Sequence, residues 1–127
     1  MTAPNIRNPS FIVGNTTGTT LTTTNLTTVL SNLANSGKVF KINSIFAANI
    51  DGITAASISI AINYNGAASD IYLAYTIEVP PDSTQVISTK ETYFYLQENC
   101  SIKAQASVAN DIAVTISYED IFEQLWN

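Results

Sequence analysis

Alternation of apolar with small or polar residues between Val39 and Tyr118 constrains the fold of this chain more than any other feature. Residues 57–64, 71–79 and 112–118 each place an apolar residue at every second position. A period of two predicts β-strands with one buried face, because successive side chains of a strand point to opposite sides of its sheet. Such strands form antiparallel sheets that pack against a second layer.

The alternation also assigns the inward-facing residues of each expected strand. Up to residue 79 these are Phe40, Ile42, Ser44, Phe46 and Ala48, then Ile58, Ile60, Ile62 and Tyr64, then Ile71, Leu73, Tyr75, Ile77 and Val79. Near the C-terminus they are Ile102, Ala104, Ala106 and Val108. Small alanines on that last face allow an opposing sheet to approach closely, and Tyr72 is left on an outward face.

Turn signals separate the runs at intervals of roughly ten residues, a spacing typical of all-β sandwiches and barrels. Asn65-Gly66 between two alternating runs is the strongest short-range hairpin signal. Pro80-Pro81 ends the strand before it, because two prolines cannot continue a hydrogen-bonded ladder. We therefore expect an all-β fold, an antiparallel β-sandwich of about seven to nine short strands with jelly-roll or immunoglobulin-like Greek-key connectivity.

Outside the alternating region the pattern is weaker. Residues 1–14 predict an irregular N-terminal arm, residues 15–121 the sandwich and residues 122–127 a short tail. The Thr-rich stretch predicts one edge strand around residues 19–24, because β-branched threonine favours extended backbone and tolerates solvent. Residues 26–33 are compatible with either a strand or a short helical turn.

Composition limits the classes of partner. The chain has 127 residues, 12% of them charged against the usual ~25%, so its polar surface consists mainly of Thr, Ser, Asn and Gln and suits permanent contact with other proteins. The net charge is −5, and the basic residues are spread along the chain: Arg7, Lys38, Lys41, Lys90 and Lys103. Without a basic cluster, neither nucleic acid nor an anionic membrane is an expected partner. No apolar run approaches the ~20 residues of a membrane span, and the N-terminus does not read as a secretory signal.

The residues available for chemistry are few. The chain contains no histidine, which excludes Ser-His-Asp and Cys-His arrangements, and its lone Cys100 is expected to be a core or turn thiol. The carboxylates fall at turns or polar strand faces, with no spacing that singles out a catalytic pair. Asp51, Asp82 and Asp111 are expected in loops, and a Ca²⁺ shared by these three residues with carbonyl oxygens is the alternative to solvated turn residues, yet no compact calcium-binding run occurs. We expect no catalytic residue, no metal and no cofactor, hence no enzyme.

Aromatic residues are the best candidates for a binding surface, since Tyr and Trp are enriched at protein interfaces. The candidate interface residues are Phe11, Ile12, Val13, Tyr72, Tyr93, Tyr95, Phe122, Leu125 and Trp126. In the tail, the apolar residues from Ile121 onward are close to helical spacing, which predicts one or two turns at most. Burial in the core and a carbohydrate-stacking platform are the alternatives for the tyrosines.

The central and C-terminal sequence resembles a family of small virion proteins of tailed bacteriophages, especially phages of cyanobacteria. The similarity covers roughly residues 37–121 and concerns strands and turns rather than catalytic motifs. The residues that carry it are Gly37 to Gly52, Tyr72-Leu73-Ala74, Thr76 to Pro80, Asp82-Ser83-Thr84, Tyr95 to Glu98 and Ile112 to Ile121.

The resemblance implies a structural component of the virion, assembled in the host cytoplasm. Its sharper form is a capsid decoration or cement protein, small and β-rich, with an arm that grips the major capsid protein. A homotrimer or another homo-oligomer is the implied state. A neck, tail or fibre component, including a host-carbohydrate binding module, is the alternative, and a depolymerase is a weaker third.

Overall fold

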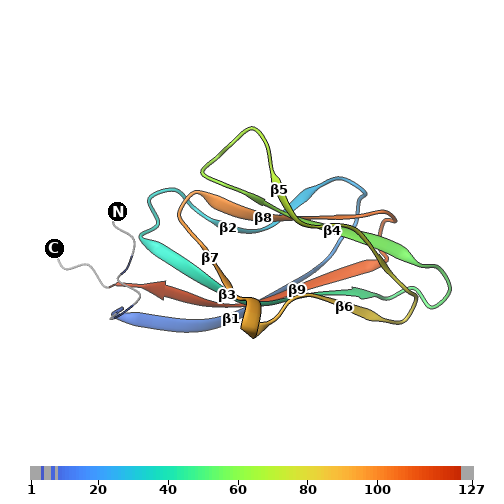
Figure 1. The fold of residues 1–127 in the computed structure, drawn as a ribbon, viewed down its shortest axis with the longest axis horizontal. Coiled ribbons are helices and arrows are strands. Elements are labelled where there is room, and N and C mark those ends of the chain that lie inside the picture. Colours follow the sequence, from blue (N-terminus) through green and yellow to red (C-terminus); the bar gives the residue numbers. More distant parts are fainter. Residues whose placement is uncertain (1–3, 5–6, 8, 124–127) are drawn as a thin grey trace.

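The structure, a computed structural model, describes Pro4, Arg7 and residues 9–123, and this part of the chain forms nine strands and one short helix (Figure 1). In chain order the elements are β1 (Phe11–Thr20), β2 (Thr27–Asn32), β3 (Lys38–Asn49), β4 (Ala56–Asn63), β5 (Ile71–Val79), β6 (Thr84–Ser88), the 3₁₀ helix η1 (Lys90–Thr92), β7 (Phe94–Leu96), β8 (Cys100–Ala106) and β9 (Ile112–Phe122).

The strands form two antiparallel sheets packed face to face (Figure 1). One has the order β1-β9-β3-β6 with β7 also paired to β3, and the other has the order β2-β8-β4-β5. β6 and β7 pair with successive parts of β3, at residues 45–48 and 40–42, so they act as one strand interrupted by η1. When β6 and β7 are counted as one strand, β8 becomes the seventh strand and β9 the eighth. The strand orders are then 1-8-3-6 and 2-7-4-5, which is the arrangement of a jelly roll.

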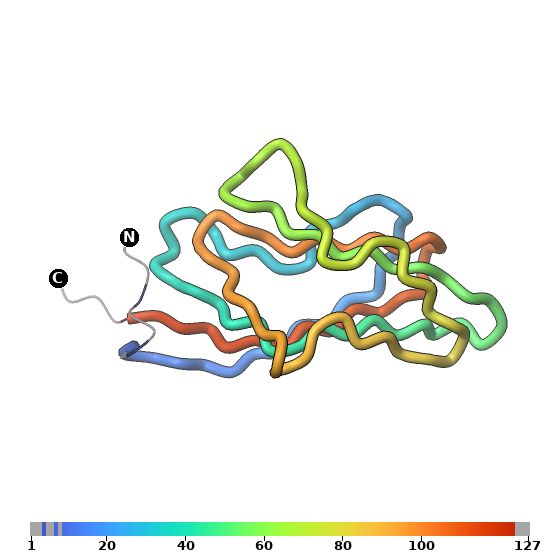
Figure 2. Tube along the Cα trace, in the orientation of Figure 1, coloured from blue at the N-terminus to red at the C-terminus, as the bar shows by residue number. Residues whose placement is uncertain are grey.

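The all-β sandwich expected from the sequence is therefore confirmed, and the connectivity selects the jelly roll over the immunoglobulin-like alternative. The chain crosses repeatedly from one sheet to the other, so neighbours within a sheet are rarely neighbours in sequence (Figure 2). The chain enters β1 and leaves β9 at the same end of the sandwich, since Phe11 is paired with Phe122.

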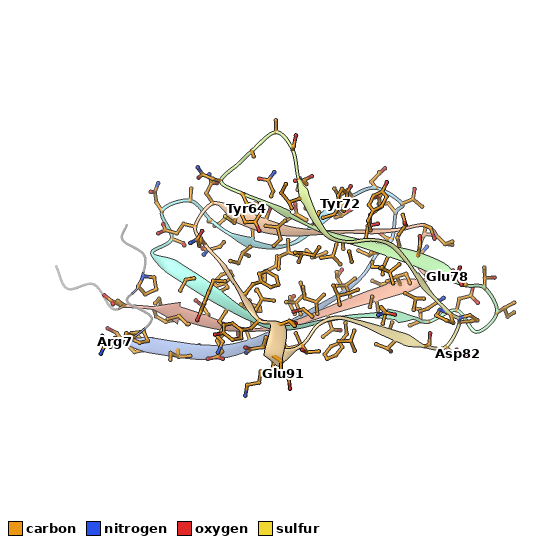
Figure 3. All side chains as sticks on the ribbon, viewed as in Figure 1. Arg7, Tyr64, Tyr72, Glu78, Asp82 and Glu91 are labelled. Carbon is orange, nitrogen blue, oxygen red and sulfur yellow. The ribbon has the colours of Figure 1, made fainter. Side chains whose placement is uncertain are left out.

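Isoleucines make up much of the core between the two sheets. Figure 3, which draws the side chains as sticks, shows side chains filling this space. The largest fully buried aliphatic side chains are Ile42, Ile45, Ile58, Ile60, Leu96, Ile102, Ile112 and Ile116. Each contributes about 1.5–3 kcal/mol by leaving water. Ala104 and Ala106 of β8 are buried in the same core, as the alternation predicts, whereas Val108 lies beyond the strand and is exposed.

The expected hairpin at Asn65-Gly66 is confirmed. Both residues have positive φ, 53° and 69°, and the amide of Ala67 donates to the carbonyl oxygen of Tyr64 at 3.0 Å. Asn and Gly are the residues that adopt this left-handed backbone most readily. The loop between β4 and β5 rises above the rest of the molecule (Figure 1), and Tyr64, which was expected inside, is exposed just after β4 ends.

The face assigned to the second half of β3 is wrong. A bulge at Asn43 shifts the pairing with β9 between Ile42 and Ser44. One extra residue inverts the alternation, because side chains repeat with a period of two. Ile45 and Ala47 are consequently buried, while Phe46 is exposed. Phe40 and Ile42, before the bulge, face the core as expected.

The faces assigned to β5 are also wrong. Of the five residues expected to point inward, only Val79 is buried, and Ile71, Leu73, Tyr75 and Ile77 are exposed. The β4–β5 pairing shifts register twice within residues 58–61, so β5 carries extra residues and does not lie flat on the core. β5 is also the edge of its sheet, with a neighbour on one side only.

The first and last strands, β1 and β9, extend further toward the ends of the chain than expected. Residues 11–14 belong to β1, which runs to Thr20 and forms the edge of its sheet, so the arm boundary at residue 14 and the edge strand at residues 19–24 are both misplaced. β9 continues through Phe122, so the tail does not turn helical at residues 119–122. Within the ambiguous stretch 26–33, residues 27–32 form strand β2 rather than a helical turn.

Candidate interaction surfaces

The described part of the chain contains no group of three or more Cys, Asp or Glu side chains placed to bind a metal ion. Asp51 and Asp82 meet through their backbone, where the amide of Asp82 donates to the carbonyl oxygen of Asp51 at 3.1 Å. Asp111 lies near Asp51, and burial, followed by the charge of Asp51, raises the pKa of Asp111. The three loop aspartates thus gather at one end of the sandwich.

Cys100 lies in the core, which was one of the two positions expected from the sequence, the other being a turn. Its side chain is buried with the central isoleucines, and its Sγ donates a weak hydrogen bond to the carbonyl oxygen of Glu98 at 3.6 Å. A thiol in this apolar setting has the packing role of a small hydrophobic residue.

The candidate interface residues fall into three separate places, of which the first is the end of the five-stranded sheet. Phe11 and Phe122 stack there with their ring centroids 5.1 Å apart. The Nζ of Lys38 lies 5.4 Å from the Phe122 ring and 3.3 Å from Oδ2 of Asp120. Ile12 and Val13 continue along β1, and both are exposed. Leu125 and Trp126, the two remaining tail candidates, lie outside the described residues.

The second place is the outer face of β7. Tyr93 and Tyr95 meet edge to face with centroids 5.8 Å apart, while Phe94 and Leu96 point to the core side. The Nζ of Lys41 lies 4.4 Å from the Tyr93 ring, a distance at which a cation is attracted by the face of an aromatic ring. Both tyrosines are exposed, so core burial does not explain them.

The third place is β5, on the other sheet. Tyr72 and Tyr75 meet edge to face with their ring centroids 4.8 Å apart. Residues three apart on a regular strand would point to opposite sides of the sheet. The register shifts of β5 make this contact possible. Tyr72 lies on the upper side of the molecule in Figure 3. Tyr75 is 63% exposed and was missed, since the alternation predicted that it points inward.

Phe46 and Val86 are two further exposed apolar residues that are not among the candidate interface residues predicted from the sequence. They are cross-strand partners of β3 and β6, and both are exposed on the outer face of the five-stranded sheet. The bulge at Asn43 places Phe46 outside. Asn43 and Ser44 are both residue types that favour turns, but such a pair inside an alternating run does not by itself specify a bulge.

An open groove of about 250 Å³ crosses the outer face of the four-stranded sheet beside β5. Ser57, Ser59 and Gln105 are among its lining residues, and Tyr75 and Thr24 also contribute to it. Gln105 Nε2 donates to the carbonyl oxygen of Thr24 at 3.0 Å, and Ser59 Oγ accepts from the amide of Thr76 at 2.9 Å. The groove is therefore polar, uncharged and bordered by one exposed aromatic ring.

No known protein-family model matches this chain, and no curated protein sequence matches it either. Within the part that the structure describes, no helix has the length and apolar character needed to cross a membrane. The function has to be argued from the surfaces themselves.

Proposed function

We propose that this chain is a non-enzymatic structural protein of a bacteriophage virion, and specifically a capsid decoration (cement) protein that binds the major capsid protein. The observation that carries the proposal is the exposure of large apolar and aromatic side chains on both sheets. Exposed apolar surface that is gathered into patches is typical of protein contact sites.

Three further features support this proposal. Jelly rolls are frequent in viral capsid proteins, although a fold alone does not specify a function. The resemblance over residues 37–121 points to virion proteins of tailed phages. Lys38 forms an ion pair with Asp120, Lys103 forms one with Asp70, and Lys41 lies over the Tyr93 ring, whereas a nucleic-acid site needs basic residues clustered on one face.

The mechanism of such a protein is mechanical. Each copy contacts neighbouring capsid subunits and adds buried area that opposes the pressure of packaged DNA. Stable protein interfaces bury about 1,600 Å² in total. Tyr93 and Tyr95, with Lys41 beside them, form a compact aromatic anchor of the kind found at the centre of such interfaces.

The copy number of this chain in purified virions tests the proposal. Quantitative mass spectrometry against the major capsid protein should give a ratio between one third and one if the chain decorates the shell. A ratio of a few per cent contradicts decoration and moves the chain to the neck, tail or fibres. Absence from virions removes the structural proposal altogether.

A binding assay with emptied shells tests the anchor. The double variant Tyr93→Ser/Tyr95→Ser should bind shells at least tenfold more weakly than the wild type. Tyr64→Ser is the matched control, because Tyr64 is as exposed as Tyr93 but lies in the loop between β4 and β5, which belong to the other sheet. Equal binding by both variants would exclude β7 as the contact.

The second candidate function is carbohydrate binding by a tail or fibre component, and the groove beside β5 favours it. Hydroxyl and amide groups together with one exposed tyrosine ring are what a sugar needs for hydrogen bonding and stacking. Glycan-array binding that is lost in Tyr75→Ala, together with a low copy number, would establish this function in place of decoration.

A further inference from the structure

β1 is an edge strand with an unusually open surface. It runs for ten residues, nine of them exposed, and pairs with β9 in continuous register from Phe11–Phe122 to Thr20–Ala113. It contains no charged residue and no proline. Among the described strands only β9 pairs with β1, so the other edge of β1 presents a long row of backbone amide and carbonyl groups without a strand partner in this part of the chain.

The other edges of the two sheets, within the described residues, are shielded in ways that β1 is not. β2 has six residues and a register shift between Thr28 and Leu30, and β6 has five residues and ends at η1. β5 has two register shifts, and its Thr76 has a φ of 48°, which is unusual for a β-branched residue. Short length, bulges and charges are the usual protections against edge-to-edge pairing.

We propose that β1 pairs in an antiparallel manner with β1 of a second copy of this chain, joining the two five-stranded sheets into one continuous sheet. Charge favours this occupant, because the chain carries a net charge of −5 while β1 carries none. Two copies can approach along β1 without bringing charged side chains together. This inference adds a partner to the proposed function and stands independently of whether the chain is a virion protein.

Symmetry restricts the register of this pairing. A twofold axis perpendicular to the sheet keeps the outer faces of the two copies on the same side. Residues that pair must then point to the same side, so odd-numbered residues pair with odd-numbered ones and even-numbered residues with even-numbered ones. The longest overlaps then pair nine residues and centre on either Asn15 or Thr16. The outer side of β1 near both centres carries small residues, and an added Cβ at Gly14 would meet nothing within 4 Å.

The size of the contact predicts its strength. Nine paired residues extend about 30 Å, and a sheet edge is about 10 Å thick, so the strip measures about 300 Å² per copy. Standard interfaces bury about 800 Å² per partner. The contact consequently rests on backbone hydrogen bonds, and a reversible, concentration-dependent dimer is the expected state of the isolated chain.

Sedimentation velocity over a wide concentration range tests the dimer. Gly14→Lys and Thr16→Lys place two like charges near the axis, and each should raise the dimer dissociation constant at least tenfold with an unchanged melting temperature. Thr84→Lys is the matched control, since it adds the same charge to the exposed edge strand β6 and should leave dimerisation unchanged. Equal effects at positions 16 and 84 would overturn the proposal.

Cysteine cross-linking tests the register without relying on affinity. At the axis, residues of the two copies have Cα atoms about 4.5–5.5 Å apart, within the range of a disulfide. Either Asn15→Cys or Thr16→Cys should form a cross-linked dimer much faster than Thr84→Cys, and Cys100 does not compete because it is buried. A monomer at every concentration with no preferential cross-link overturns the second copy as partner. If such a monomer lost shell binding in Thr16→Lys, the occupant would be a capsid strand instead.

Discussion

The side-chain amide of Asn49 donates a hydrogen bond to the carbonyl oxygen of Val79 at 2.9 Å, and this bond joins β3 of one sheet to β5 of the other. Asn49 also donates to the carbonyl oxygen of Thr54 at 3.0 Å. At the other end of β3, Asn32 of β2 donates to the carbonyl oxygens of Lys38 and Leu96 at 2.8 and 3.0 Å. Two buried asparagines thus connect the sheets at both ends of the sandwich.

Replacing Asn49 by alanine should lower the free energy of unfolding by about 2–4 kcal/mol, because two carbonyl groups then lose their donor. Urea denaturation measures the loss. Asn25→Ala, in the exposed connection between β1 and β2, is the control and should change stability by less than about 0.5 kcal/mol. Equal stability of both variants would show that water replaces the amide of Asn49.

Aspartate substitutions on β4 and β5 should have opposite outcomes. Ile60→Asp should prevent folding, because a carboxylate at this fully buried position costs on the order of 5 kcal/mol. Leu73→Asp should fold normally, although the alternation predicts that Leu73 is buried, because the side chain is 44% exposed. Circular dichroism and thermal melting distinguish the two, and loss of folding in Leu73→Asp would restore the inward assignment of β5.

A second buried position checks the opposite sheet. Ile116 of β9 is packed in the same core as Ile60, so Ile116→Asp should also prevent folding. A melting curve like that of the wild type in either buried variant would contradict the core described here.

Asp70 should make the protein less stable in acid. The hydrogen bond from Asn63, at 2.9 Å, and then the partnership with Lys103 hold the pKa of Asp70 below its ordinary value of 3.8. A lowered folded-state pKa stabilises the protein above the unfolded-state pKa, and this stabilisation is lost as the pH falls through the folded-state pKa. Asp70→Asn should thus be less stable than the wild type at pH 7, with the difference shrinking below about pH 4. A constant difference across that range would contradict the assignment.

Asp111 should act in the opposite direction. Burial and the charge of Asp51 raise the pKa of Asp111 above its ordinary value of 3.8, so the ionised carboxyl destabilises the fold at neutral pH. Asp111→Asn should therefore increase stability at pH 7, and the gain should disappear as the pH falls below 3.8, where the wild-type carboxyl is neutral in both states. A loss of stability at pH 7 would show that the asparagine fails to replace a favourable contact.

N-terminal deletions should distinguish an arm from a strand. An arm at residues 1–14 predicts that removing all of it preserves the fold, whereas residues 11–14 are paired with residues 119–122 in the structure. Removing residues 1–14 should lower the melting temperature well below that of a protein lacking only residues 1–10, because only the longer deletion breaks the Phe11–Phe122 stack. Equal melting temperatures would restore the arm.

Much of the fold could be predicted where strands are central and regular. Ile58, Ile60 and Ile62 of β4 and Ile112, Val114 and Ile116 of β9 are buried as the period of two requires, since both strands have neighbours on either side. That Tyr93 and Tyr95 share one face also follows from that period, but their exposure did not, and the outward position of Tyr72 was inferred from an assignment of the β5 faces that is wrong. Their separation into distinct surfaces did not follow, because it depends on which strands share a sheet.

The sequence by itself determined that the chain is an all-β sandwich with an isoleucine-rich core and without the residues for histidine-based catalysis. Only the tertiary structure decided which side chains of β3 and β5 face outward, that the jelly-roll order brings β1 beside β9, and that β1 is left as an open edge. The physical reason is that one bulged residue, as at Asn43, inverts every later side chain of its strand, while an asparagine within an alternating run does not by itself specify a bulge. Edge positions likewise depend on the pairing of distant segments, which no window of neighbouring residues contains.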